Sequence, residues 1–109
     1  MLMQPVRIDT VFRALSDPTR RAVFERIVRA ERNVAELTRD SGITQGAVSQ
    51  HLKLLKQAGL VTERPEGRKT FYRAAPEGLA PIFDWLSHYD SFWRDRFTDL
   101  RALLEEIDP

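Results

Sequence analysis

The chain has 109 residues, which fits a single domain over residues 1–109 with a modest hydrophobic core. Its composition, 42% hydrophobic and 30% charged, is that of a soluble globular protein, and no apolar run approaches the roughly 20 residues of a membrane span. It has no cysteine, which excludes disulfides, thiolate metal sites and thiol redox sensing. The formal net charge is only +1, but the charges are unevenly distributed along the chain.

The N-terminal part carries the signals of two helices. Residues 1–7 lack the apolar core and cleavage site of a secretory signal, so we expect a cytoplasmic protein. Apolar residues at steps of three and four predict a first helix over about 9–15. Asp17 is a good N-cap and Pro18 suits the first helical position, so a second helix should run to about Ala30.

A third, short helix and a tight turn follow. Asn33, with Glu36 three residues further on, has the capping-box pattern of a helix over about 34–40. Gly42 permits a positive φ where that helix ends, and Thr44 can cap the next helix. Two helices joined by a short glycine-containing turn form a helix-turn-helix.

The fourth predicted helix, over about 44–58, has two chemically different faces. At roughly 100° per residue, its apolar face holds Ala47, Val48, His51, Leu52, Leu55 and Ala58. Amide, hydroxyl and ammonium groups on the opposite face suit base edges and phosphates. Residues 44–60 contain no carboxylate, which a surface that approaches phosphates must exclude. We therefore expect DNA contacts from Thr44, Gln45, Gly46, Ser49, Gln50 and Lys53.

After this helix the pattern changes to that of a β-hairpin over about 60–74. Residues 60–64 and 69–73 are rich in branched and aromatic side chains, and proline and glycine lie between them. The hairpin would form a wing, with Arg64, Arg68, Lys69 and Arg73 at its tip and flanks, placed to contact phosphates or a minor groove. A plain solvated hairpin is the alternative, which its position directly after the predicted reading helix disfavours.

The C-terminal part is predicted as one long helix over about 78–107, marked by apolar residues at steps of three and four. Its apolar stripe is longer than the rest of a small protein can cover, so we expect it to close a homodimer. The expected interface residues are Val11, Phe12, Leu86, Trp93, Phe97, Leu100, Leu103 and Leu104. The whole pattern predicts a mostly α fold with a small β-hairpin, in the order α-α-α-α-β-β-α.

Charge is segregated along the chain. Residues 1–75 carry 14 Lys/Arg against 8 Asp/Glu, a net of +6, and residues 76–109 carry 3 against 8, a net of −5. The basic part would face an anionic partner and the acidic part would face away from it. The alternative is that the charges are distributed in this way by chance.

Three segments, residues 14–20, 48–61 and 66–72, carry a family resemblance through their order and spacing. In them the chain resembles the ArsR/SmtB family of small winged-helix repressors. The resemblance implies a homodimer closed by the first and last helices, which binds a palindromic operator in double-stranded DNA and represses transcription. It also implies that the fourth helix enters the major groove while the hairpin contacts the flanking backbone.

The metal-sensing sites of many family members have no counterpart in this sequence. Cysteines are absent, and Asp84 with His88, at i and i+4, supplies too few ligands for a site unless a dimer mate completes the set. We expect a solvated or hydrogen-bonded pair there, with no metal and no cofactor, and the inducing signal is unknown.

Other functions were weighed against DNA binding. His51 lies among apolar neighbours, which predicts a packed, hydrogen-bonded side chain, and Trp85 and Trp93 are expected in a core or dimer interface rather than a ligand pocket. An enzyme is disfavoured because there is no Gly-rich phosphate loop and because Ser49 and His51 point to different sides of one helix. The competing hypothesis is a protein-interaction module that works through the aromatic C-terminal helix.

Overall fold

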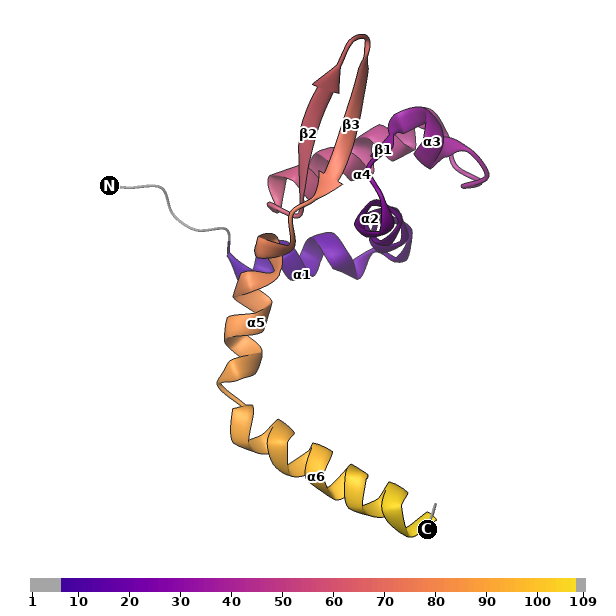
Figure 1. The fold of residues 1–109 in the computed structure, drawn as a ribbon. Coiled ribbons are helices and arrows are strands. Elements are labelled where there is room, and N and C mark those ends of the chain that lie inside the picture. The colour runs from indigo at the N-terminus through magenta and orange to yellow at the C-terminus, as the bar shows by residue number, and fades with distance from the viewer. Residues whose placement is uncertain (1–6, 108–109) are drawn as a thin grey trace, which may run out of the picture.

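The computed structural model describes residues 7–107 (Figure 1). Residues 1–6, on which most of the expectation about a secretory signal rests, and residues 108–109 lie outside the described residues. The elements are α1 (Ile8–Ser16), α2 (Pro18–Arg29), β1 (Arg32–Asn33), α3 (Val34–Thr38), α4 (Gln45–Gln57), β2 (Val61–Glu66), β3 (Lys69–Ala74), the 3-10 helix η1 (Pro76–Leu79), α5 (Ala80–Ser87) and α6 (Asp90–Ile107). The strands form an antiparallel sheet in the order β1-β3-β2. The predicted winged helix-turn-helix is confirmed.

A polar junction joins α1 to α2. The carboxylate of Asp17 caps α2 by accepting a hydrogen bond from the backbone N–H of Arg20 at 3.0 Å. The Arg20 side chain then reaches back, and its Nε donates to the carbonyl oxygen of Ala14 at 2.6 Å. Arg21 donates in the same way to the carbonyl oxygen of Leu15 at 2.7 Å. These bonds satisfy carbonyl groups that have no partner at the C-terminal end of α1.

The helix-turn-helix is fixed by caps that the sequence predicted. Asn33 and Glu36 form the capping box, with bonds of 2.8 and 2.9 Å between each backbone N–H and the other residue's side chain. Thr44 caps α4 by accepting from the backbone N–H of Ala47. In the turn, Gly42 has the expected positive φ of 79°, and Asp40 has a φ of 60° that was not foreseen.

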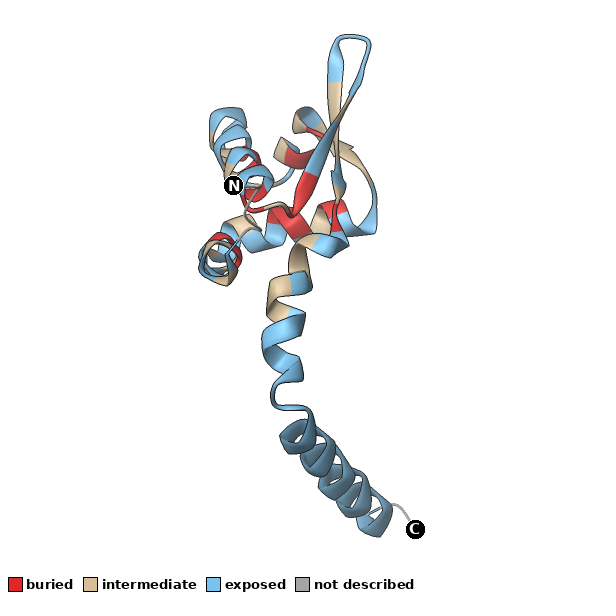
Figure 2. Ribbon diagram, turned by 90° about the vertical axis from the view of Figure 1, so that its left-hand side faces the viewer, coloured by how far each residue is buried: buried red, intermediate tan, exposed pale blue. Residues whose placement is uncertain are grey.

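The core lies between the first four helices and the root of the hairpin, the part coloured red in Figure 2. From α4 it takes Val48, Leu52 and Leu55, followed by Ala58 at the helix end, as the predicted apolar face requires. The expectation that Val11 lies in the dimer interface is wrong, because its side chain is completely buried in this core and offers no surface to a partner.

The hairpin is tighter at its tip than the sequence suggested. Glu66 pairs with Lys69, so the connecting loop has only two residues, Gly67 and Arg68. Gly67 has a φ of +62° while Arg68 does not have a positive φ, which is the pattern of a type II′ turn. Pro65 lies in β2, where an edge strand tolerates a residue without an N–H. The two-residue strand β1 was not predicted.

The predicted single C-terminal helix is wrong, because the chain breaks between α5 and α6. The hydroxyl of Ser87 donates to the carbonyl oxygen of Asp84 at 2.6 Å, and His88 Nδ1 lies 2.9 Å from the same oxygen. Side chains that occupy a helical carbonyl compete with the backbone ladder. The backbone N–H groups of His88 and Tyr89 accordingly donate three residues back, to Trp85 and Leu86.

Beyond this break α6 extends away from the rest of the protein (Figures 1 and 2). The radius of gyration is 18.0 Å, against about 13 Å for a compact chain of this length. No residue of α5 or α6 is buried. Between residues 7 and 107, no helix is both long and apolar enough to cross a membrane.

Candidate nucleic-acid interface

The polar face of α4 is open along its N-terminal part. The opposite face is held in the core, and this fixes the rotation of the helix about its own axis. All six residues that the sequence predicted for this face are exposed: Thr44, Gln45, Gly46, Ser49, Gln50 and Lys53. Thr44 uses an oxygen lone pair for the cap, so its hydroxyl proton is still available to an acceptor.

The wing tip and the start of α4 line one hollow of about 320 Å³. Arg68 and Lys69 line it from the wing, Gln45 lines it from α4, and Ala35 lines it from α3. Sequence reasoning missed Thr70, which lines the same hollow. Strand alternation could have found it, because Thr70 lies two residues before Tyr72 and therefore on the strand face that packs against the core. Cations, an amide and a hydroxyl together suit a phosphate group.

Arg64 is bound within the sheet and is not a free cation. Its Nε lies 2.7 Å from Oε1 of Glu31, its Nη1 lies 3.3 Å from Glu66, and its guanidinium stacks 5.0 Å from the ring centre of Phe71. The other carboxylate oxygen of Glu31 holds Arg73 at 3.1 Å. The hydrogen bond that Arg64 donates to Glu31 raises the pKa of Arg64 above its ordinary value. Glu31 thus links the start of β1 to both strands of the wing.

Lys56, near the C-terminal end of α4, is also occupied. Its ammonium lies 2.9 Å from Oε1 of Glu63 on β2, and this hydrogen bond raises the pKa of Lys56. The pair connects the end of the reading helix to the root of the wing. Lys53 is the α4 cation that remains without an ion pair among the described residues.

The two histidines differ in their surroundings. His51 is half-buried as predicted, but its Nδ1 has no hydrogen-bond partner among the described residues. His88 bonds to the backbone oxygen of Asp84 rather than to its carboxylate. No group of three metal-ligating side chains gathers anywhere in residues 7–107.

The α5–α6 arm presents a continuous apolar surface. Phe12 of α1 packs edge-on against Trp85 at 5.8 Å, and Trp85 packs against Tyr89 at 5.6 Å. The remaining predicted interface residues, Leu86, Trp93, Phe97, Leu100, Leu103 and Leu104, are between 36% and 62% exposed. Most helices in proteins owe their stability to a packed apolar face, and α6 has none among residues 7–107.

Comparison with known proteins agrees with this geometry. Residues 15–64 match a family described as a helix-turn-helix domain. The chain is 41% identical over 97 residues to the HTH-type transcriptional regulator Rv2034 of Mycobacterium tuberculosis, covering 89% of this chain and 88% of that protein. The chain belongs to the ArsR/SmtB family.

Solved structures of ArsR-family regulators have the same fold. The crystal structure of the ArsR family transcriptional regulator RHA00566 gives a TM-score of 0.72 at 28% identity, covering 86% of this chain and 97% of that one. The homodimeric winged helix-turn-helix DNA-binding domain Mb0332 of Mycobacterium bovis, a possible ArsR-family regulator, gives 0.62 at 28% identity over 84% of this chain and 91% of that one. The ArsR/SmtB family is a family of transcriptional regulators, and this chain is a member.

Proposed function

We propose that the protein is a homodimeric transcriptional repressor that binds a palindromic operator through α4 and the wing. The observation that carries the proposal is the exposed, carboxylate-free face of α4 beside a cationic hollow. An α-helix fits the major groove, and the side chains on this face are those that bond base edges and phosphates.

The contacts divide by chemistry. Ser49 and Gln50, at the centre of the exposed face, are assigned to base edges. The other contacts are assigned to the backbone and come from Thr44, Gln45, Gly46, Lys53, Arg68 and Lys69. Arg64 is reassigned, because its ion pairs with Glu31 and Glu66 make it a support of the wing rather than a phosphate contact.

The homodimer is proposed to form through the arm and α1. No described part of the chain covers the apolar surface of α5 and α6, and a two-fold axis would offer each copy the same surface in return. The interface would use Phe12, Leu86, Trp93, Phe97, Leu100, Leu103 and Leu104. The homodimeric Mycobacterium bovis domain supports this assembly. Two reading helices in a fixed relation would match half-sites about one helical turn apart.

We further propose that residues 1–109 act as one winged helix-turn-helix domain, in the cytoplasm and without catalytic activity. A protein-interaction module that uses only the arm is the weaker candidate. It gives no reason for α4 to keep carboxylates off its exposed face while Glu31 and Glu63 hold cations elsewhere.

The test measures binding to an operator selected from random duplexes and to an unrelated duplex. Gln50→Ala should weaken operator binding by roughly 1–3 kcal/mol and leave the unrelated duplex unaffected. Arg68→Ala should weaken both alike and reduce the salt slope by about 1. Gln57→Ala is the matched control, because Gln57 lies in a hollow beside α1 and should change neither. Equal losses on both duplexes for Gln50→Ala would contradict its assignment.

A further inference from the structure

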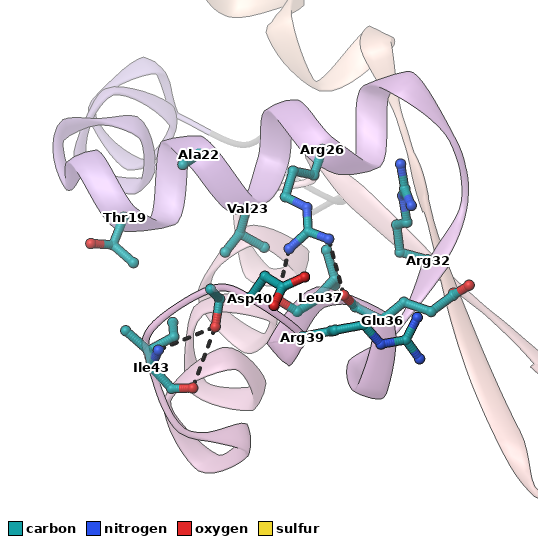
Figure 3. Close-up of a pocket in the computed structure, with 11 residues that line it drawn as sticks. Thr19, Ala22, Val23, Arg26, Arg32, Glu36, Leu37, Arg39, Asp40 and Ile43 are labelled. Atoms are coloured by element: carbon teal, nitrogen blue, oxygen red, sulfur yellow. Dashed lines mark hydrogen bonds between the residues drawn. The ribbon is translucent and has the colours of Figure 1, made fainter.

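A second pocket, of about 320 Å³, lies between α2 and the turn that leads to the reading helix (Figure 3). Ala22 and Val23 line it from α2, and Leu37 and Ile43 line it from α3 and the turn. These side chains give the pocket an apolar wall. None of the residues assigned to DNA lines this pocket.

Three arginines and two carboxylates also line this pocket. In Figure 3, Arg26 extends from α2 towards the end of α3, where it donates to the carbonyl oxygens of Leu37 at 2.8 Å and Glu36 at 3.0 Å. These neutral acceptors hold the guanidinium in place but leave its charge uncompensated. Arg32 and Arg39 line the same pocket.

Arg26 and Arg32 are half-buried and form no ion pair with any described residue, which is unusual in this protein. The other two half-buried arginines, Arg20 and Arg64, each form an ion pair with a carboxylate. Within residues 7–107, none of the three pocket arginines does. The Nε of Arg32 is fully buried and has no acceptor in the part of the chain that the structure describes. A buried donor of a charged group is normally satisfied, so an acceptor is missing at this place.

The two carboxylates in the lining limit what the acceptor can be. Glu36 already accepts the backbone N–H of Asn33 at 2.9 Å, and Asp40 lies exposed in the turn. Three cations against two carboxylates leave a net charge of +1 in the lining. This balance suits a single negative charge better than a multiply charged anion.

We propose that this pocket binds a small organic monocarboxylate with an apolar body, and that its occupancy changes DNA affinity. The carboxylate would bond to Arg32 and Arg26 after a small rotation of the Arg32 guanidinium, and the body would lie against Ala22 and Ile43. Because the pocket joins α2 to the turn before α4, a bound ligand would alter how the reading helix is held. This regulatory half of the proposal rests on the proposed function.

Calorimetry with benzoate and 3-methylbutanoate, without DNA, tests the site. We expect saturable binding of at least one acid, one per protomer, and at least tenfold weaker binding of its neutral amide. Arg32→Met and Arg26→Met should each weaken binding by tenfold or more, and circular dichroism should show both variants folded. Arg29→Met, an exposed arginine at the end of α2 outside the lining, is the matched control and should bind normally.

The possible outcomes test the ligand site and its effect on DNA affinity separately. Equal binding of acid and amide, absence of saturable binding by either acid, or tighter binding of inorganic phosphate would overturn the site. Operator affinity should change at least threefold with the bound acid in the wild type and not in Arg32→Met. An unchanged operator affinity at saturation would overturn the regulatory half. If no duplex binds at all while the acid binds, the proposed function fails and the pocket stands.

Discussion

Adding one methyl group at Gly78 should destabilise the protein severely. A Cβ at this position would lie 2.1 Å from the carbonyl oxygen of Gly59, 2.7 Å from its carbonyl carbon and 3.2 Å from Cα of Leu60. Contacts between such atoms are normally near 3.5 Å, so the backbone must move by about 1 Å or more. The segment resists this movement, because the N–H of Ala75 donates to the carbonyl oxygen of Leu60 at 2.8 Å.

The expected cost of Gly78→Ala is about 3 kcal/mol, at the upper end of the range for overpacking. For a protein of this size, that lowers the melting temperature by about 12–24 °C. Differential scanning calorimetry at equal protomer concentration measures it, because dimer formation makes the melting temperature depend on concentration.

Gly46→Ala is the matched control. Its new Cβ would meet only Oγ1 of Thr44, at 3.9 Å, so no atom has to move. Removing a glycine from a helix should stabilise the protein by about 0.5–1 kcal/mol. The same chemical change is therefore expected to have opposite signs at the two positions. A Gly78→Ala protein that melts with the wild type would refute the close approach of η1 to the end of α4.

Three further outcomes are expected. Glu31→Gln should release Arg73 and remove one of the two carboxylates that hold Arg64. Affinity for an unrelated duplex should then rise, and the logarithmic salt slope should steepen by up to about 0.9 for each arginine that gains a phosphate. An unchanged slope in fluorescence anisotropy would contradict this. Leu100→Glu should shift the protein to monomer in sedimentation and abolish operator binding, whereas Ala102→Glu, on the other side of α6, should do neither. Asp17→Asn keeps an N-cap but removes the charge that the Arg20 N–H stabilises. Because that bond lowers the pKa of Asp17 below 3.8, the wild type should be the more stable at neutral pH in urea unfolding. The difference should vanish as the pH falls from 3.8 through the lower folded-state pKa, and a constant difference at all pH values would argue against the charge effect.

Most helix starts could be predicted because their signals are local. Asp17, Asn33 and Thr44 each cap a helix by accepting an N–H only three residues away, so the bond depends on nothing but the neighbouring sequence. The two faces of α4 could also be predicted from local sequence, because the helical repeat alone places its apolar and polar residues on opposite sides.

The break after α5 shows where a periodic pattern fails. Apolar residues continue at helical spacing across it, because both helices carry part of one exposed surface. The competing bonds from Ser87 and His88 to the carbonyl oxygen of Asp84 occupy a single turn, which a pattern summed over many residues does not detect.

The sequence by itself therefore determined the first four helices, the hairpin, the helix caps and the chemistry of the α4 surface. Only the tertiary structure decided which cations are free. Glu31 and Arg64 lie 33 positions apart and meet only because the sheet brings β1 and the hairpin together. Arg26, Arg32 and Arg39 likewise gather at one pocket from α2, β1 and the turn. The strength of an electrostatic interaction depends on the distance between the charges in space. The order of residues along the chain does not give that distance for segments that only the fold brings together.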